Sequence, residues 1–118
     1  MTFPKRGEVY LVQFDPARGS EIRKTRPALI IQNDIGNRYS PIVIVAAITS
    51  KLSPIPYPVE VPVSGTKGNG LFQASAVQLN QIRSVDKERL VKRMGVLDKT
   101  TMQKVDAAMM ISLGLTEV

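Results

Sequence analysis

The chain has 118 residues, close to the size of one small domain, and it contains neither Cys nor His. Disulfides, thiol nucleophiles, histidine acid–base pairs and the usual zinc ligand sets are therefore excluded. The 16 Lys and Arg against 10 Asp and Glu give a net charge of +6, which favours an anionic partner such as nucleic acid.

Apolar residues are spread evenly along residues 1–118, so we expect a single domain with one core. The beginning, MTFPKRGEVYLV, has no apolar core of the kind that signal peptides carry. No apolar run approaches the ~18 residues that a membrane-spanning helix needs. We therefore expect a cytoplasmic protein that does not enter a membrane.

The first half of the chain predicts three strands. Residues 8–14 (EVYLVQF) are rich in β-branched and aromatic residues, and residues 28–32 (ALIIQ) form a second apolar run. Residues 33–41 (NDIGNRYSP) have the composition of turns. Residues 42–49 (IVIVAAIT) are almost continuously apolar, which indicates a third strand that is buried on both faces.

The second half predicts further short strands and one helix. Prolines surround YPVEV, residues 57–61, so this segment is at best an edge strand, and GTKGNG, residues 65–70, is expected to be a turn. Residues 74–85 alternate as a strand with one polar face, and residues 86–93 predict a short helical turn before MGVL. Asp98 is the predicted N-cap of a helix that ends at Gly114. The side chains of this helix that are expected to face the core are Met102, Val105, Met109 and Leu113.

These elements predict a fold class. Five or six short strands with turns rich in Pro and Gly, followed by one late helix, favour an α+β fold that is mostly β. A small, mostly antiparallel barrel fits this order of elements better than alternating βαβ units.

Arg26 is the first candidate functional residue. Because it precedes Pro27, its backbone is held in an extended conformation at the entrance of a strand. The planar guanidinium, which carries five donors and a permanent charge, suits a phosphate oxyanion. A solvated arginine at a strand edge is the simpler explanation when Arg26 is considered alone.

Thr49 is the second candidate, because it places a hydroxyl where the third apolar strand ends and precedes Lys51. A β-branched residue in a strand also explains Thr49 without any function. The segment from Arg18 to Lys24 is a basic loop with one carboxylate, Glu21, and it could contact phosphates.

RGEVYLVQFDP, GSE, RPALIIQND, AIT and LNQIRSVDKERL occur in this order and spacing between Arg6 and Leu115. With these motifs the chain resembles the MazF/PemK toxins of type II toxin-antitoxin systems. The resemblance implies a homodimeric, SH3-like β-barrel with a C-terminal helix (PemK/CcdB-like). It also implies a sequence-specific endoribonuclease, or mRNA interferase, that cuts single-stranded RNA without a metal or cofactor. A cognate MazE-like antitoxin with an acidic, disordered tail would inhibit it.

The resemblance assigns residues by position. Arg26 in RPALI matches the catalytic arginine of the family, and Thr49 in AIT matches its catalytic threonine. The resemblance favours Arg26 as a participant in proton transfer, although a guanidinium is a poor base, and Glu21 is the alternative base. Relatives often carry a carboxylate at the position of Asn80, which bears on the recognised sequence and not on the cutting chemistry. The expected RNA contacts are Arg18, Ser20, Arg23, Lys24, Lys51, Asn80, Gln81 and Arg83.

The chemistry of RNA agrees with this assignment. RNA supplies its own nucleophile, the 2′-hydroxyl beside each phosphate, so the chain needs no Cys, His or metal-bound water for the attack. Arg26 and Thr49 would stabilise the extra negative charge of the phosphorane, and the products would be 2′,3′-cyclic phosphate and 5′-hydroxyl ends.

Two other functions stay open on the sequence alone. One is a basic barrel that binds nucleic acid or a partner without catalysis. The other is a toxin of the same superfold that poisons DNA gyrase. The presence of both Arg26 and Thr49 argues against these alternatives, because a protein that does not cleave RNA has no chemical need for the pair.

Overall fold

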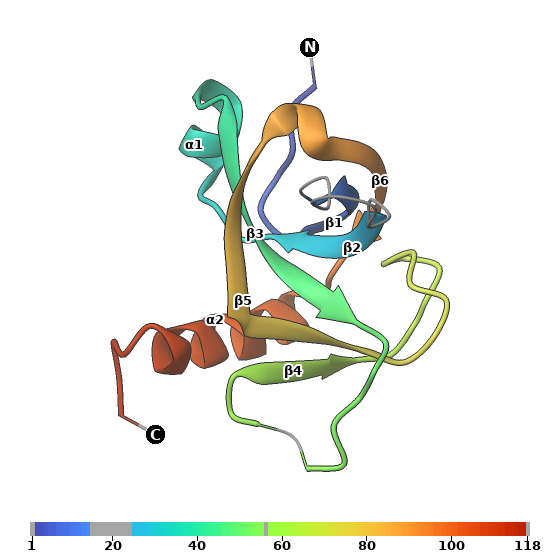
Figure 1. The fold of residues 1–118 in the computed structure, drawn as a ribbon, viewed down its shortest axis with the longest axis vertical. Helices are drawn as coiled ribbons and strands as arrows, with labels where there is room; N and C mark the ends of the chain where they lie inside the picture. Colours follow the sequence, from blue (N-terminus) through green and yellow to red (C-terminus); the bar gives the residue numbers. More distant parts are fainter. Residues whose placement is uncertain (1, 15–24, 56, 118) are drawn as a thin grey trace, which may run out of the picture.

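The fold is built on one six-stranded antiparallel sheet with the strand order β4-β5-β3-β2-β1-β6 (Figure 1). The structure, a computed structural model, describes residues 2–14, 25–55 and 57–117. The strands are β1 (Glu8–Gln13), β2 (Thr25–Ile30), β3 (Ile42–Thr49), β4 (Glu60–Val63), β5 (Ser75–Asp86) and β6 (Leu90–Val96). The helices are α1 (Asp34–Tyr39), α2 (Lys99–Ser112) and the 3-10 turn η1 (Lys87–Arg89). None of the helices in these ranges is long and apolar enough to cross a membrane.

The expected antiparallel, mostly β fold with a C-terminal helix is confirmed. The sheet is curled, but it does not close into a complete barrel, because β4 and β6 are its two edge strands. Pro62 lies in β4, at an edge of the sheet, where a missing N–H is tolerated.

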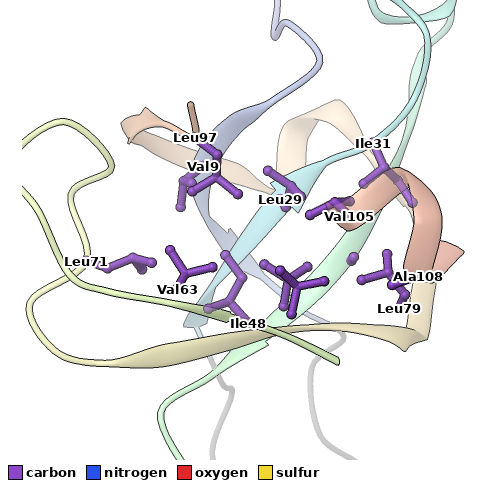
Figure 2. Close-up of a cluster of buried hydrophobic side chains, with 13 residues drawn as sticks. Val9, Leu29, Ile31, Ile48, Val63, Leu71, Leu79, Leu97, Val105 and Ala108 are labelled. Carbon is purple, nitrogen blue, oxygen red and sulfur yellow. The ribbon is translucent and has the colours of Figure 1, made fainter. Parts of the chain in front are cut away.

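Each face of the sheet carries its own apolar cluster, because successive side chains of a strand point to opposite faces. The larger cluster lies between the sheet and α2 and contains Val9, Leu29, Ile48, Val77 and Leu79 (Figure 2). The smaller cluster consists of Val12, Phe14, Ala28, Ile30, Val43 and Val45. The third strand thus contributes to both faces, which confirms the reason for its almost continuous apolar run.

Helix α2 begins as its sequence predicts. The Asp98 side chain accepts a hydrogen bond from the Thr101 N–H at 2.7 Å, and hydrogen bonds from the side chain and backbone of Thr101 hold the pKa of Asp98 below its ordinary value. Val105 and Ala108 are buried in the larger cluster, and Met102 and Met109 pack against it. Leu113, by contrast, lies beyond the last helical residue and is exposed, so the predicted stripe ends one turn early.

The turn predicted over residues 33–41 is instead the short helix α1. Asn33 is its N-cap, and its side chain accepts a hydrogen bond from the Gly36 N–H at 2.8 Å. The Asn37 side chain is fully buried and donates to the Gln32 carbonyl at 2.9 Å. Asn and Asp form the same local hydrogen bonds in turns and in helix caps, so composition alone did not separate the two.

Two other boundaries differ from the prediction. Strand β2 begins at Thr25, so Arg26 and Pro27 lie inside the strand rather than before it. The helical turn predicted over residues 86–93 is limited to η1, and the rest of that segment belongs to β6, which pairs with β1. In both cases pairing with a neighbouring strand extends β structure beyond what local propensity indicates.

The glycine-rich segment 65–70 forms the expected turn and packs against β6. The Val96 N–H donates to the Gly68 carbonyl at 2.9 Å, and the buried Asn69 side chain accepts from the backbone of Thr66 and Leu71. A Cβ on Gly95 would lie 2.3 Å from the Gly68 carbonyl oxygen, so the backbones can approach this closely only because the residue is glycine. The turn therefore connects the region after β4 to β6, the other edge of the sheet.

Replacing Gly95 with alanine should separate this turn from β6. Because the new methyl group would overlap backbone atoms, we expect Gly95→Ala to lower the free energy of unfolding by about 1–3 kcal/mol, measured by urea denaturation. Gly68→Ala is the matched control, since a Cβ there has only the Thr66 hydroxyl nearby, at 3.7 Å, and it should change stability by less than about 0.5 kcal/mol. Equal losses in the two variants would contradict the proposed close contact.

Candidate active site

Arg26 and Thr49 are brought together by the register of β2 on β3. Ala28 pairs with Ala47, so two further residues along each strand place Arg26 opposite Thr49 and on the same face. Both residues line a hollow of about 350 Å³, which we call the Arg26–Thr49 hollow. The two residues singled out in the sequence therefore meet at one place.

The hollow opens where the β2–β3 ladder ends. Pairing between these strands stops at Ala28 and Ala47, and the next residue of β2 is Pro27, which has no N–H to continue a ladder. Pro27 and Ile48, which would form the next pair, both line the Arg26–Thr49 hollow. The proline thus helps to create the opening beside which Arg26 stands.

The hydroxyl of Thr49 has a defined role in local hydrogen bonding. Its oxygen accepts from the Lys51 N–H at 3.1 Å, in the turn that follows β3. A hydroxyl that accepts in this way keeps its own hydrogen for another acceptor. Thr49 can therefore donate to a ligand oxygen in the hollow, and Lys51, which also lines it, adds a positive charge.

A second hollow of about 340 Å³ shares Arg26 with the first. It is lined by Phe14, Arg26, Ala47, Gln78, Gln81 and Arg83, and we call it the glutamine hollow. The Arg83 guanidinium carbon lies 5.3 Å from the centre of the Phe14 ring, a cation–π distance that restrains the side chain. Because Arg26 lines both hollows, a ligand phosphate at Arg26 would have amide and cationic groups within reach on the neighbouring side.

An irregularity in β5 shapes the glutamine hollow. The pairing of β5 with β3 steps from Ala46–Ile82 to Ala47–Gln78, so Leu79, Asn80 and Gln81 have no partner on β3. Residues three apart on a regular strand lie on opposite faces, yet Gln78 and Gln81 both line this hollow. The irregularity therefore adds a second amide to the same surface.

The backbone of Leu79, which lies within this irregularity, is held by hydrogen bonds to residues outside β3. Its N–H donates to the Val59 carbonyl at 2.8 Å, and its carbonyl accepts from the Ser112 hydroxyl at the end of α2. The buried backbone of the irregular segment thus finds partners elsewhere, as buried polar groups must. The last turn of α2 consequently helps to fix the glutamine hollow.

The structure gathers some of the predicted site residues and not others. Arg26, Thr49 and Lys51 line one hollow, and Gln81 and Arg83 join Arg26 in the other. Asn80 is exposed on β5 and lines neither of them. The predicted loop residues Arg18, Ser20, Glu21, Arg23 and Lys24 lie outside the described residues.

Sequence reasoning missed several residues of the two hollows. Gln73 and Ser75 line the Arg26–Thr49 hollow, and so does Phe72, whose side chain is 97% exposed. They reach the site only because the chain returns from the glycine turn to β5, and no local pattern indicates such a return. Gln78 had a weaker signal, since it belongs to the polar face predicted for β5.

The anchor between α2 and β5 can be tested by removing one hydroxyl. Ser112→Ala leaves the buried Leu79 carbonyl without its side-chain partner, so we expect the free energy of unfolding to fall by about 1 kcal/mol in urea denaturation. Gln103→Ala, on an exposed position of the same helix, should not destabilise the protein. If Ser112→Ala were as stable as this control, the hydroxyl would contribute nothing to holding β5.

Comparison with known proteins identifies the family. Residues 5–113 match the family model for PemK-like, MazF-like toxins of type II toxin-antitoxin systems. Over 113 residues the chain is 46% identical to Endoribonuclease EndoA of Bacillus subtilis (strain 168). The alignment covers 96% of this chain and 97% of that protein. The fold is similar to that of an endoribonuclease solved in complex with its cognate antitoxin from Mycobacterial species, with a TM-score of 0.77 and 26% identity over 98% of this chain and 99% of that one.

A further solved structure shows how well the fold is shared. A MazE–MazF complex from Deinococcus radiodurans matches with a TM-score of 0.82 and 22% identity, covering 98% of this chain and 100% of that one. The family match spans nearly the whole chain, and it includes the strands that carry Arg26, Thr49, Gln81 and Arg83. The chain belongs to the PemK-like, MazF-like family of toxins of type II toxin-antitoxin systems.

Proposed function

We propose that this chain is a toxin domain that cleaves single-stranded RNA at the Arg26–Thr49 hollow, without a metal ion. The observation that carries the proposal is the convergence of a permanently charged guanidinium and a free hydroxyl donor at one opening in a chain of this toxin family. The naming of the Bacillus subtilis relative as an endoribonuclease supports the activity. The two alternatives, a binding-only barrel and a gyrase poison, gain no comparable support.

The attack uses a nucleophile that belongs to the substrate. The 2′-oxygen of one nucleotide forms a bond to the adjacent phosphorus, and the bond from phosphorus to the 5′-oxygen of the next nucleotide breaks. The products are a 2′,3′-cyclic phosphate and a 5′-hydroxyl. The proton lost by the 2′-hydroxyl and the proton gained by the 5′-oxygen balance over the reaction.

Arg26 and Thr49 stabilise the negative charge that develops between the attack of the 2′-oxygen and the departure of the 5′-oxygen. As the pentacoordinate phosphorane forms, its non-bridging oxygens gain negative charge, and the guanidinium can donate two hydrogen bonds to them. The Thr49 hydroxyl donates a third, because its own oxygen is already engaged by the Lys51 N–H. Lys51 adds electrostatic attraction for the phosphate from the same wall.

Proton acceptance from the 2′-hydroxyl needs a different group. A guanidinium stays protonated under ordinary conditions and is a poor base. Glu21 is the carboxylate that we propose for this role, on the strength of its place in the GSE motif. Its position lies outside the described residues, so this assignment is based on the sequence.

The glutamine hollow is the proposed surface for reading bases next to the cleaved phosphate. The amides of Gln78 and Gln81 offer both donors and acceptors to the edges of unstacked bases, while Arg83 suits a phosphate. Asn80, Arg18, Ser20, Arg23 and Lys24 stay predicted RNA contacts on the sequence alone.

The proposed partners follow from charge and from the relatives. The mycobacterial relative was solved with its cognate antitoxin, which supports a MazE-like antitoxin for this chain. An acidic antitoxin segment would compete with RNA for a chain of net charge +6. We also propose that the chain forms a homodimer and acts in the cytoplasm, where its RNA substrates are found.

The catalytic assignment predicts a loss of turnover without a loss of structure. Arg26→Ala and Thr49→Val each remove one donor to the transition state, so we expect at least ~100-fold slower cleavage of a long single-stranded RNA in EDTA. Thr49→Ser keeps the hydroxyl and should retain most activity. Primer extension locates the cuts, and analysis of the product ends tests for cyclic phosphate.

Arg38→Ala is the matched control for the arginine. Arg38 lies on α1, where it contacts the rings of Phe3 and Tyr39 and lines neither of the two hollows. Its removal should leave the cleavage rate and the cut sites unchanged. Wild-type rates for both Arg26→Ala and Thr49→Val would show that the chemistry occurs elsewhere.

A further inference from the structure

A third hollow, of about 580 Å³, adjoins the Arg26–Thr49 hollow along β6. We propose that this β6 hollow binds the nucleotide next to the cleaved phosphate, with its base on apolar side chains and its phosphates on Lys67 and Lys92. This proposal rests on the proposed RNA cleavage and adds a path for the flanking RNA. The β6 hollow meets the Arg26–Thr49 hollow at Leu71, Phe72 and Met94, whereas the glutamine hollow meets it at Arg26.

The two hollows adjoin each other. Leu71, Phe72 and Met94 line both of them, so the two spaces share these three residues. The sheet register gives the same result, because Pro27 of the Arg26–Thr49 hollow pairs with Leu11, and Leu11 pairs with Lys92. Two strand spacings amount to roughly 10 Å, a short step for an RNA strand that already has a phosphate at Arg26.

The charge of the β6 hollow suits phosphates. Three cationic residues, Lys67, Lys92 and Arg93, line it, and no carboxylate lines it among the residues that the structure describes. Arg93 is already paired with Glu8. Lys67 and Lys92 make no ion pair within the described ranges, so their charges are available to a ligand.

The floor of the β6 hollow suits a base. Leu11 and Met94 provide apolar surface, and Phe72 stands at the boundary between the two hollows with 97% of its side chain exposed. The preceding residue, Leu71, is buried, and its N–H donates to the Asn69 side chain, which fixes the backbone that presents the Phe72 ring. An exposed aromatic ring between cations is a typical platform for stacking a base of a single strand.

These features favour RNA over an acidic peptide as the occupant. A strand of RNA alternates flat bases with phosphates, and the lining of the hollow includes both apolar side chains, with the Phe72 ring among them, and two lysines. A peptide rich in carboxylates would be attracted by Lys67 and Lys92 but would gain little from Phe72 and Met94. We therefore assign the hollow to the flanking nucleotide and treat the acidic peptide as an outcome of the test.

The test measures binding with cleavage blocked. Wild-type protein first locates a cut in a long RNA, and an RNA oligonucleotide spanning that cut is then made with a 2′-deoxy sugar at the attacking position. For Lys67→Ala/Lys92→Ala we expect about 10-fold weaker binding and a slope of log K against log salt that is smaller by roughly 1.4, because two phosphate contacts are lost. Phe72→Ala should weaken binding by about 10-fold with the slope unchanged.

Truncated oligonucleotides and a control pair locate the effect. The RNA is shortened to the cleaved dinucleotide, either from its 5′ end or from its 3′ end. In the truncation that removes the nucleotide bound by the β6 hollow, the lysine variant should bind as tightly as wild type. Lys99→Ala/Lys104→Ala removes the same charge from exposed positions on α2 and should have a much smaller effect on the salt slope. An equal change of slope in the two double variants would reduce the result to net charge and overturn the proposal.

Two further outcomes are informative. If the lysine variant loses affinity for an oligoglutamate peptide but keeps its affinity for the RNA, the hollow serves an acidic protein segment and the RNA assignment is wrong. If wild-type protein cuts no RNA at all, the proposed function fails. Binding of a random-sequence single-stranded RNA pool by the same variants would then still support or overturn the β6 hollow by itself.

Discussion

The register between β2 and β3 is the constraint on which the rest of the structure depends. Leu29 pairs with Ala46 and Ala28 pairs with Ala47, so Leu29 enters the larger cluster while Ala28 faces the smaller one. A slip of one residue would turn every side chain of β2 to the other face and expose Leu29. Burial of the core therefore fixes the same alignment that places Arg26 opposite Thr49. In this way the geometry of the site follows from the packing of residues that never touch a substrate.

The openings around Arg26 result from places where strand pairing stops. At Pro27 the ladder with β3 cannot continue, and the Arg26–Thr49 hollow begins there. At Leu79 the ladder of β5 with β3 is interrupted, and the glutamine hollow lies beside it. The freed backbone of Leu79 is satisfied by Val59 and Ser112, so the interruption costs little in lost hydrogen bonds. Local breaks in a regular sheet thus provide space for a ligand while the core stays intact.

The features that the sequence predicted well are those determined by residues close to one another along the chain. The strand over residues 42–49 and the cap at Asp98 follow from hydrophobic pattern and capping chemistry, and the structure confirms both. Helix α1 was missed because Asn33 and Gly36 suit a turn as well as a helix cap. Arg26 and Thr49 were found through their family motifs, whereas Phe72 and Gln73 were not, because only the return of the chain from the glycine turn brings them to the hollow. Contacts between distant segments have no local signal, and this is where sequence reasoning stopped.

The proposed reaction also accounts for a preference for RNA over DNA. The chain has no Cys or His, and in the proposed reaction the nucleophile is the 2′-hydroxyl that RNA, unlike DNA, carries beside each phosphate. In the proposed reaction Arg26 and Thr49 stabilise negative charge, and that task requires fixed donors more than titratable ones. Both residues belong to strands rather than to mobile loops, and the Thr49 oxygen is further restrained by the Lys51 N–H. The same donors would bind a phosphate of DNA, but without the 2′-oxygen no internal attack follows, so discrimination against DNA is a consequence of the reaction itself.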